Sequence, residues 1–153
     1  MIGEILFGVI ALSSSPTSVQ QAASEEPACL RVCEADISTV GQRECLSREK
    51  DVAQRQLDTA LAAVEESFAK TTHIDPSIPD AFRKAQAAWD AYYTADCAAV
   101  SAGWAGGSGA RGATLFCGVV HLRRRTHDLW STYDLESSMP LPAVICNDQR
   151  PGA

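Results

Sequence analysis

Cysteine is the residue type with the clearest chemistry in this chain, and the sequence holds six of them. They are Cys29, Cys33, Cys45, Cys97, Cys117 and Cys146. An even number of cysteines behind an N-terminal apolar run is typical of a disulfide framework formed in an oxidising compartment. Six cysteines can pair in many ways, and the sequence alone does not choose among them. We predict that all six are oxidised in the mature protein.

Metal binding is the alternative use for clustered cysteines. The only close pair is Cys29 and Cys33, and no histidine stands at zinc-finger spacing from it. His121 and His127 lie six residues apart, which differs from the four-residue spacing of a helical metal pair. We therefore expect no metal and no cofactor.

Catalytic motifs are weak in this sequence. Ser108 lies in a Gly-rich segment, but Gly-Gly-Ser-Gly-Ala lacks both the pattern of a nucleophile elbow and a strand before it. The same segment lacks the Gly-Lys-Ser/Thr ending of a phosphate-binding loop. We predict that the protein is not an enzyme.

Three segments with helical periodicity must position the cysteines. The first covers about 42–70, the second begins at an Asp80 N-cap and ends by Gly103, and the third covers about 113–134. The apolar stripe of the first is Val52, Leu57, Leu61, Val64 and Phe68, with Ala53 and Ala60 on the same side. The second stripe is Phe82, Ala85, Trp89, Tyr92, Cys97 and Val100. The third is Leu115, Val119, Leu122, Thr126, Leu129 and Tyr133.

These stripes predict an all-α fold, namely a disulfide-stapled three-helix bundle in up-down-up order. A Gly-rich loop over 103–112 would connect the second and third helices, and no strand is expected. This order places Cys45, Cys97 and Cys117 at the same end of the bundle. The chain of 153 residues has room for a single domain, and 46% hydrophobic residues suit a globular core.

Net charge limits the class of partner. The formal charge is −6 at pH 7, which suits a cationic partner and disfavours nucleic acid. Arg123, Arg124 and Arg125 are consecutive, but residues on a helix are about 100° apart, so they cannot form one basic patch. We expect one of the three to face inward against an acceptor.

The N-terminus indicates export. Residues 1–23 resemble a signal peptide, with an apolar run from Ile5 to Leu12 and small residues at Ala22 and Ala23. That run is too short to span a bilayer, so no permanent membrane anchor is expected. We divide the rest into a linker over 24–36, a helical domain over 37–136 and an irregular tail over 137–153.

Aromatic residues allow two interpretations at two places. Trp89, Tyr92 and Tyr93 could form a ligand shelf, but their helical spacing favours core packing, and Gln86 would bond across the bundle. In the Gly-rich loop, Trp104, Ser108 and Arg111 could enter an enzyme's cleft, because Trp and Arg are frequent binding hot spots. Alternatively, Trp104 folds back as a lid on the end of the bundle.

A family resemblance covers Cys33 to Tyr133. Ala85-Gln86-Ala87-Ala88-Trp89, followed by Tyr92 and Cys97, resembles the AQ-x-x-W … C centre of the LprI-type lysozyme-inhibitor family. Cys33 and Cys45 are similar to its opening cysteine pair. Its closing segment is similar to Gly106-Gly107-Ser108 followed by Cys117, Arg125 and Leu129. The resemblance implies a small secreted bacterial helical protein, with structural roles for Gln86, Trp89, Tyr92, Arg125 and Leu129.

The function predicted from this resemblance is binding and inhibition of a cationic lysozyme-type hydrolase, in the periplasm or outside the cell. A structural or envelope-stress module that inhibits no enzyme is the alternative.

Overall fold

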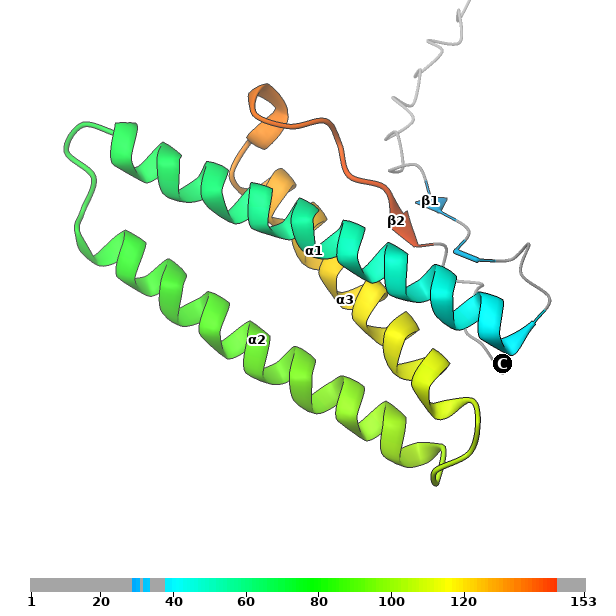
Figure 1. Ribbon diagram of the computed structural model, residues 1–153. Helices are drawn as coiled ribbons and strands as arrows, with labels where there is room; N and C mark the ends of the chain where they lie inside the picture. Colours follow the sequence, from blue (N-terminus) through cyan, green and yellow to red (C-terminus); the bar gives the residue numbers. More distant parts are fainter. Residues whose placement is uncertain (1–28, 31, 34–37, 146–153) are drawn as a thin grey trace, which may run out of the picture.

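The computed structural model describes residues 29–30, 32–33 and 38–145. Three long helices make up most of this part of the chain: α1 (Thr39–Lys70), α2 (Ser77–Gly103) and α3 (Ala110–Thr132). They follow one another in up-down-up order, as Figure 1 shows. The predicted three-helix fold is therefore confirmed. The predicted signal peptide and most of the linker lie outside the described residues.

Local capping residues set where the first two helices begin. Ser38 accepts a hydrogen bond from the backbone N–H of Gly41 at 3.0 Å, so α1 begins three residues earlier than predicted. Asp80 is not the N-cap of α2, because that helix already begins at Ser77. The carboxylate of Asp75 accepts the Ser77 backbone N–H at 2.9 Å instead, and this bond lowers the pKa of the Asp75 carboxyl.

The core lies mainly between α1 and α3. The fully buried residues of α1 are Ala53, Leu57, Ala60 and Val64, and those of α3 include Val119, Leu122, Thr126 and Leu129. Both sets follow the stripes that periodicity predicted. Burying one Leu or Val side chain stabilises the fold by about 1.5–3 kcal/mol. The α1–α3 pair is therefore the stable centre of the molecule.

Helix α2 is attached mainly to α3, and few of its residues are buried. Only Phe82 and Cys97 of this helix are buried. Phe82 meets Phe68 and Tyr133 edge-on, with ring centroids 5.5 and 5.4 Å apart. The predicted α2 stripe was wrong at three positions, since the structure exposes Ala85, Tyr92 and Val100. Tyr92 still touches α3, because its ring lies edge-on to that of His121 with centroids 5.5 Å apart.

Two disulfides staple the helices. Cys33 bonds to Cys45 in α1, and Cys97 in α2 bonds to Cys117 in α3. The starts of α1 and α3 lie close together. A Cβ built on Gly112 of α3 would lie 3.9 Å from the Arg43 side chain of α1. These cysteines therefore gather towards one end of the bundle, as predicted. The prediction that all six cysteines are oxidised also concerns Cys146, which lies outside the described part of the chain.

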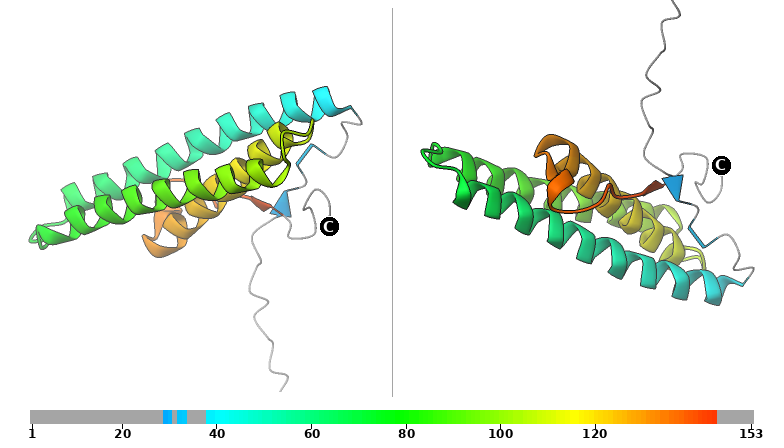
Figure 2. Two further views of the ribbon diagram at one scale, coloured as in Figure 1. Left: turned by 90° about the horizontal axis from the view of Figure 1, so that it is seen from below. Right: turned by 90° about the horizontal axis from the view of Figure 1, so that it is seen from above.

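The tail after α3 is more regular than predicted. It contains a 3-10 helix, η1 (Leu135–Ser137), and a strand, β2 (Val144–Ile145). Strand β2 pairs in parallel with β1 (Cys29–Leu30), with Cys29 opposite Val144. Leu135 is buried in the core, and Trp130 donates its indole N–H to the carbonyl oxygen of Met139 at 3.0 Å. Figure 2 shows this strand pair at the flank of the bundle, beside α3.

Candidate partner-binding surface

The connection between α2 and α3 is short and built from tight turns. It covers residues 104–109, because Ala110, Arg111 and Gly112 already belong to α3. The backbone N–H of Gly107 donates to the carbonyl oxygen of Trp104 at 2.8 Å, and that of Ala110 donates to Gly107 at 3.0 Å. Gly106 has a φ of 77°, a conformation that favours glycine. These bonds fix the shape of the connection at the end of the bundle.

Trp104 lies across this connection. A Cβ at Gly109 would overlap the six-membered ring of Trp104, so glycine is what lets the indole pack this closely against residue 109. The residue nevertheless remains 41% exposed. Its indole is therefore folded onto its own loop while one side faces solvent. Ser108 and Arg111 are also exposed, so all three predicted partner-binding residues lie at one accessible end of the protein.

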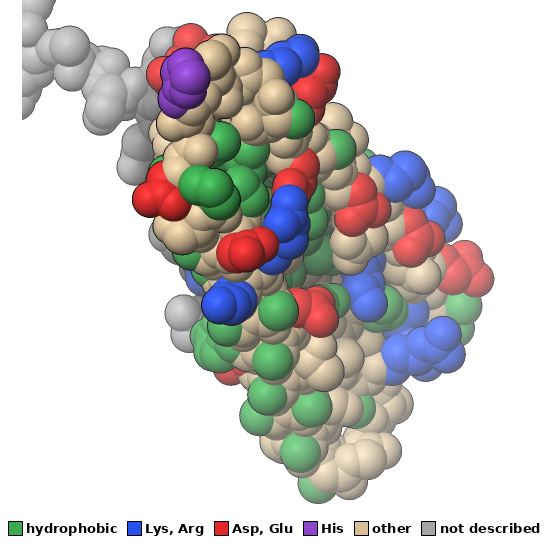
Figure 3. Space-filling model, turned by 90° about the vertical axis from the view of Figure 1, so that its left-hand side faces the viewer, with side chains coloured by type: hydrophobic (Ala, Val, Ile, Leu, Met, Phe, Trp, Pro, Cys, Tyr) green, Lys and Arg blue, Asp and Glu red, His purple; other side chains and the backbone are tan. Residues whose placement is uncertain are grey.

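A groove separates α1 from α2 because the two helices have few direct contacts. One hollow of about 540 Å³ is lined by Leu57, Phe82 and Trp89 among others, and a second of about 830 Å³ is lined by Lys50, Tyr93 and Thr94 among others. Gln54 borders both hollows. Figure 3 shows acidic and basic side chains mixed over this side of the molecule, with apolar side chains gathered towards its lower end.

An ion pair bridges the groove near the turn that connects α1 to α2. The Arg83 guanidinium in α2 donates to both carboxylate oxygens of Glu65 in α1, at 3.0 and 2.9 Å. This bidentate pair raises the pKa of Arg83. More than half of the Arg83 side chain is exposed, so the pair contributes little stability. It joins the two helices beside the edge-on contact of Phe82 with Phe68.

The residues of the family motif form contacts between α2 and α3. Arg125 donates from Nε to the Gln86 side-chain oxygen at 3.0 Å, and its guanidinium lies 5.8 Å from the Trp89 ring centroid. Trp89 stacks on Tyr93 with ring centroids 5.4 Å apart and is partly buried against the core. Leu129 is fully buried. Tyr92, in contrast, is 58% exposed and cannot serve as a core residue.

The most deeply buried cation among the described residues is Arg123, which the motif did not indicate. It is only 4% exposed, and its guanidinium donates to Glu49 in α1 at 2.6 Å. Burial lowers the pKa of Arg123, and the nearby Glu49 carboxylate partly offsets this effect. The expectation that one arginine of the run faces inward against an acceptor is confirmed by Arg123 and the Glu49 carboxylate. Arg125, to which the resemblance gives a structural role, is only partly buried.

Sequence reasoning also missed a compact group at the second disulfide. His121 lies one helical turn after Cys117, and its Nε2 is 2.7 Å from the Asp96 carboxylate in α2. A sequence pattern could have indicated this group, because the four-residue spacing from Cys117 to His121 places both side chains on one face of a helix. The six-residue spacing between His121 and His127, considered above, does not indicate this group.

The fold and this surface define a class: a small disulfide-stapled helical protein with an exposed polar and aromatic end. None of the described helices is long and apolar enough to cross a membrane. The family model described as "Lysozyme inhibitor LprI" matches residues 29–129. The chain belongs to this family. No curated protein and no solved structure matches the chain.

Proposed function

We propose that this protein binds and inhibits a lysozyme-type muramidase, and that it acts in the periplasm or outside the cell. Membership of the lysozyme-inhibitor family is the observation that carries this proposal. The two disulfides support an oxidising location, since such bonds persist outside the reducing cytosol. We propose a binding role and no catalytic one, which agrees with the family's description.

We propose the α2–α3 connection as the surface that meets the enzyme. Muramidases of this type act with a pair of carboxyl groups in a cleft. A guanidinium can pair with a carboxylate through two parallel hydrogen bonds, and Arg111 offers one at the exposed start of α3. Trp104 supplies an aromatic surface beside it, and Ser108 a hydroxyl. The tight turns between them would lower the entropy cost of binding.

Net charge supports a cationic target. The chain carries a formal charge of −6, and opposite charge on a partner accelerates the encounter of two proteins. We expect added salt to slow association while leaving the dissociation rate nearly unchanged. Surface plasmon resonance at several salt concentrations measures both rates. A salt effect confined to dissociation would contradict steering by net charge.

The test of the surface is a pair of variants, Trp104→Ala and Arg111→Gln. Each should weaken binding to a lysozyme by about 30-fold, which corresponds to about 2 kcal/mol, the cost of losing a hot-spot contact. The melting temperature should stay nearly constant, because both residues are exposed. Ile78→Ala is the matched control, since Ile78 is an exposed apolar residue at the start of α2, at the other end of the bundle.

The outcomes separate the possible surfaces. Full affinity in both variants would place the contact elsewhere, and weakening by Ile78→Ala alone would place it at the other end of α2. A matching loss of melting temperature and affinity would give Trp104 a structural role. If the unaltered protein bound neither a basic nor an acidic lysozyme, a structural or envelope-stress role without enzyme inhibition would be the better interpretation.

A further inference from the structure

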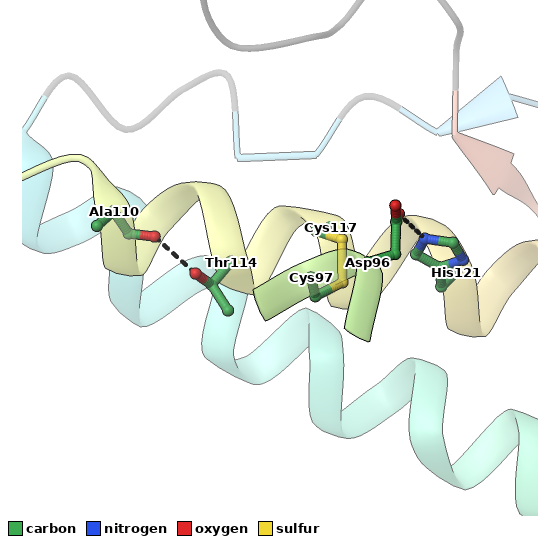
Figure 4. The surroundings of a disulfide bond; sticks show 6 residues. All are labelled: Asp96, Cys97, Ala110, Thr114, Cys117 and His121. Carbon is green, nitrogen blue, oxygen red and sulfur yellow. Dashed lines mark hydrogen bonds and ion pairs between the residues drawn. A yellow bond between two sulfur atoms is a disulfide. The ribbon is translucent and has the colours of Figure 1, made fainter. Parts of the chain in front are cut away.

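The Cys97–Cys117 disulfide lies in a group of metal-ligating side chains. The Sγ atoms of Cys97 and Cys117 and a ring nitrogen of His121 all lie within 4.8 Å of one another. Asp96 adds a carboxylate oxygen 2.7 Å from His121 Nε2. Figure 4 shows the four side chains converging from α2 and α3. Two sulfurs and one imidazole are donors that zinc prefers, and a carboxylate bonded to the imidazole commonly orients such a ligand.

Cys97 and His121 are shielded from solvent, whereas the Asp96 side chain beside them is 42% exposed. Cys97 is buried, and only 15% of the His121 side chain is exposed. The Tyr92 and Tyr93 rings lie against His121, with centroids 5.5 and 5.8 Å away. In the structure the two sulfurs are bonded to each other, so neither is free to bind an ion. Reduction would free both sulfurs and let them move apart to hold an ion between them.

We propose that reduction of the Cys97–Cys117 disulfide converts this group into a binding site for zinc or a similar divalent ion. A dithiol reductant supplies two electrons and two protons, so that the S–S bond of the protein breaks and two thiols form. The reductant is itself oxidised to a cyclic disulfide. The ion then displaces both thiol protons to solvent and binds the two thiolates and the His121 imidazole. Asp96, which is paired with His121, would orient the imidazole, and water would complete the coordination.

The consequence is that one connection between α2 and α3 can take two chemical forms. Cys97 is one of only two buried residues of α2, so the bond at this position secures the second half of that helix. A bound ion would restore the same connection in a reducing environment. The site does not depend on the proposed inhibition of a muramidase and can exist without it.

The experiment is a Co²⁺ titration of the full chain, reduced under argon with a water-soluble phosphine. The phosphine takes an oxygen from water and becomes a phosphine oxide, while the disulfide gains two hydrogens. Reduced protein should bind Co²⁺ with the absorption of tetrahedral thiolate coordination, and Zn²⁺ should abolish that absorption by displacement. Oxidised protein should show none. Zn²⁺ should also raise the melting temperature of the reduced protein.

Several variants together identify the site. His121→Ala should weaken Co²⁺ binding at least tenfold, and Asp96→Asn should weaken it by about 10–100-fold. His127→Ala is the matched control, because His127 is on the same helix, is half-buried and lies outside the group. His121→Ala leaves every thiol in place, so it separates this site from binding at the other cysteines. Undiminished binding in His121→Ala, or in Cys97→Ser, would overturn the proposal.

Discussion

At the scale of single residues, the contact between Arg123 and Glu49 is the most deeply buried ion pair in the part of the chain that the structure describes. The Arg123 side chain is 5% exposed and that of Glu49 is 32% exposed, so this pair is largely removed from water. Among the described residues, Arg123 Nε has no hydrogen-bond partner. The Glu49 carboxylate is therefore the main compensation for a buried positive charge. Removing one partner of a buried pair costs more than removing both.

We predict that Glu49→Gln lowers the free energy of unfolding by about 2 kcal/mol, because it leaves Arg123 buried without a counter-charge. The double variant Glu49→Gln with Arg123→Met should lose less than the single variant. Urea unfolding followed by circular dichroism measures both values. Glu44→Gln, at an exposed position of the same helix, is the control. Equal stability of the Glu49 and Glu44 variants would mean that solvent already screens the pair.

At the scale of elements, helix α2 is attached to the rest of the bundle by few buried side chains. The helix has 27 residues but buries only Phe82 near its start and Cys97 near its end. Between them, Gln86 and Trp89 contact Arg125 through polar and aromatic interactions. Such a helix should open more readily than α1 or α3, since low local stability follows from few buried apolar contacts.

We predict that Phe82→Ala lowers the free energy of unfolding by about 3 kcal/mol, the cost of truncating a buried aromatic side chain. Ile78→Ala, at an exposed site four residues earlier, should cost less than about 0.5 kcal/mol. Hydrogen exchange should show faster amide exchange in the first half of α2 of the Phe82 variant, with α1 and α3 changed only in proportion to the global loss. Uniform acceleration in all three helices would show that α2 does not open separately.

At the scale of the whole molecule, oxidation links segments that are distant in sequence. Two disulfides occur among the described residues, and they use four of the six cysteines. The register of β1 and β2 places Cys29 opposite Val144, two residues before Cys146 in the sequence. A third bond between Cys29 and Cys146 would close a loop over most of the chain and restrict its unfolded state.

We predict that the mature protein has no free thiol, so that its intact mass lies six hydrogens below that of the reduced chain. Mass spectrometry after alkylation without a reductant measures this difference. Peptide mapping should then recover a Cys29–Cys146 linked peptide beside the two bonds already described. Alkylation at two cysteines would contradict the prediction, and the labelled positions would identify the unpaired residues.

The sequence by itself determined the helices of the core and the family. In α1 and α3, the stripes containing Leu57 and Val64 and containing Leu122 and Leu129 are buried as the 3.6-residue period requires. Periodicity succeeds there because each of these helices packs a broad face against the other. The resemblance carried by Gln86, Trp89 and Cys97 led to the family whose model matches the chain.

Only the tertiary structure decided what depends on a neighbour from another part of the chain. Tyr92 fits an apolar stripe, yet it is exposed because α2 packs mainly on one helix, α3. Arg123 looks like its neighbours in the sequence, yet Glu49, which lies 74 residues away, makes its burial possible. The pairing of cysteines and the approach of Asp96 to His121 are likewise set by how α2 docks on α3. A periodic pattern defines one face of a helix, whereas packing decides what that face meets.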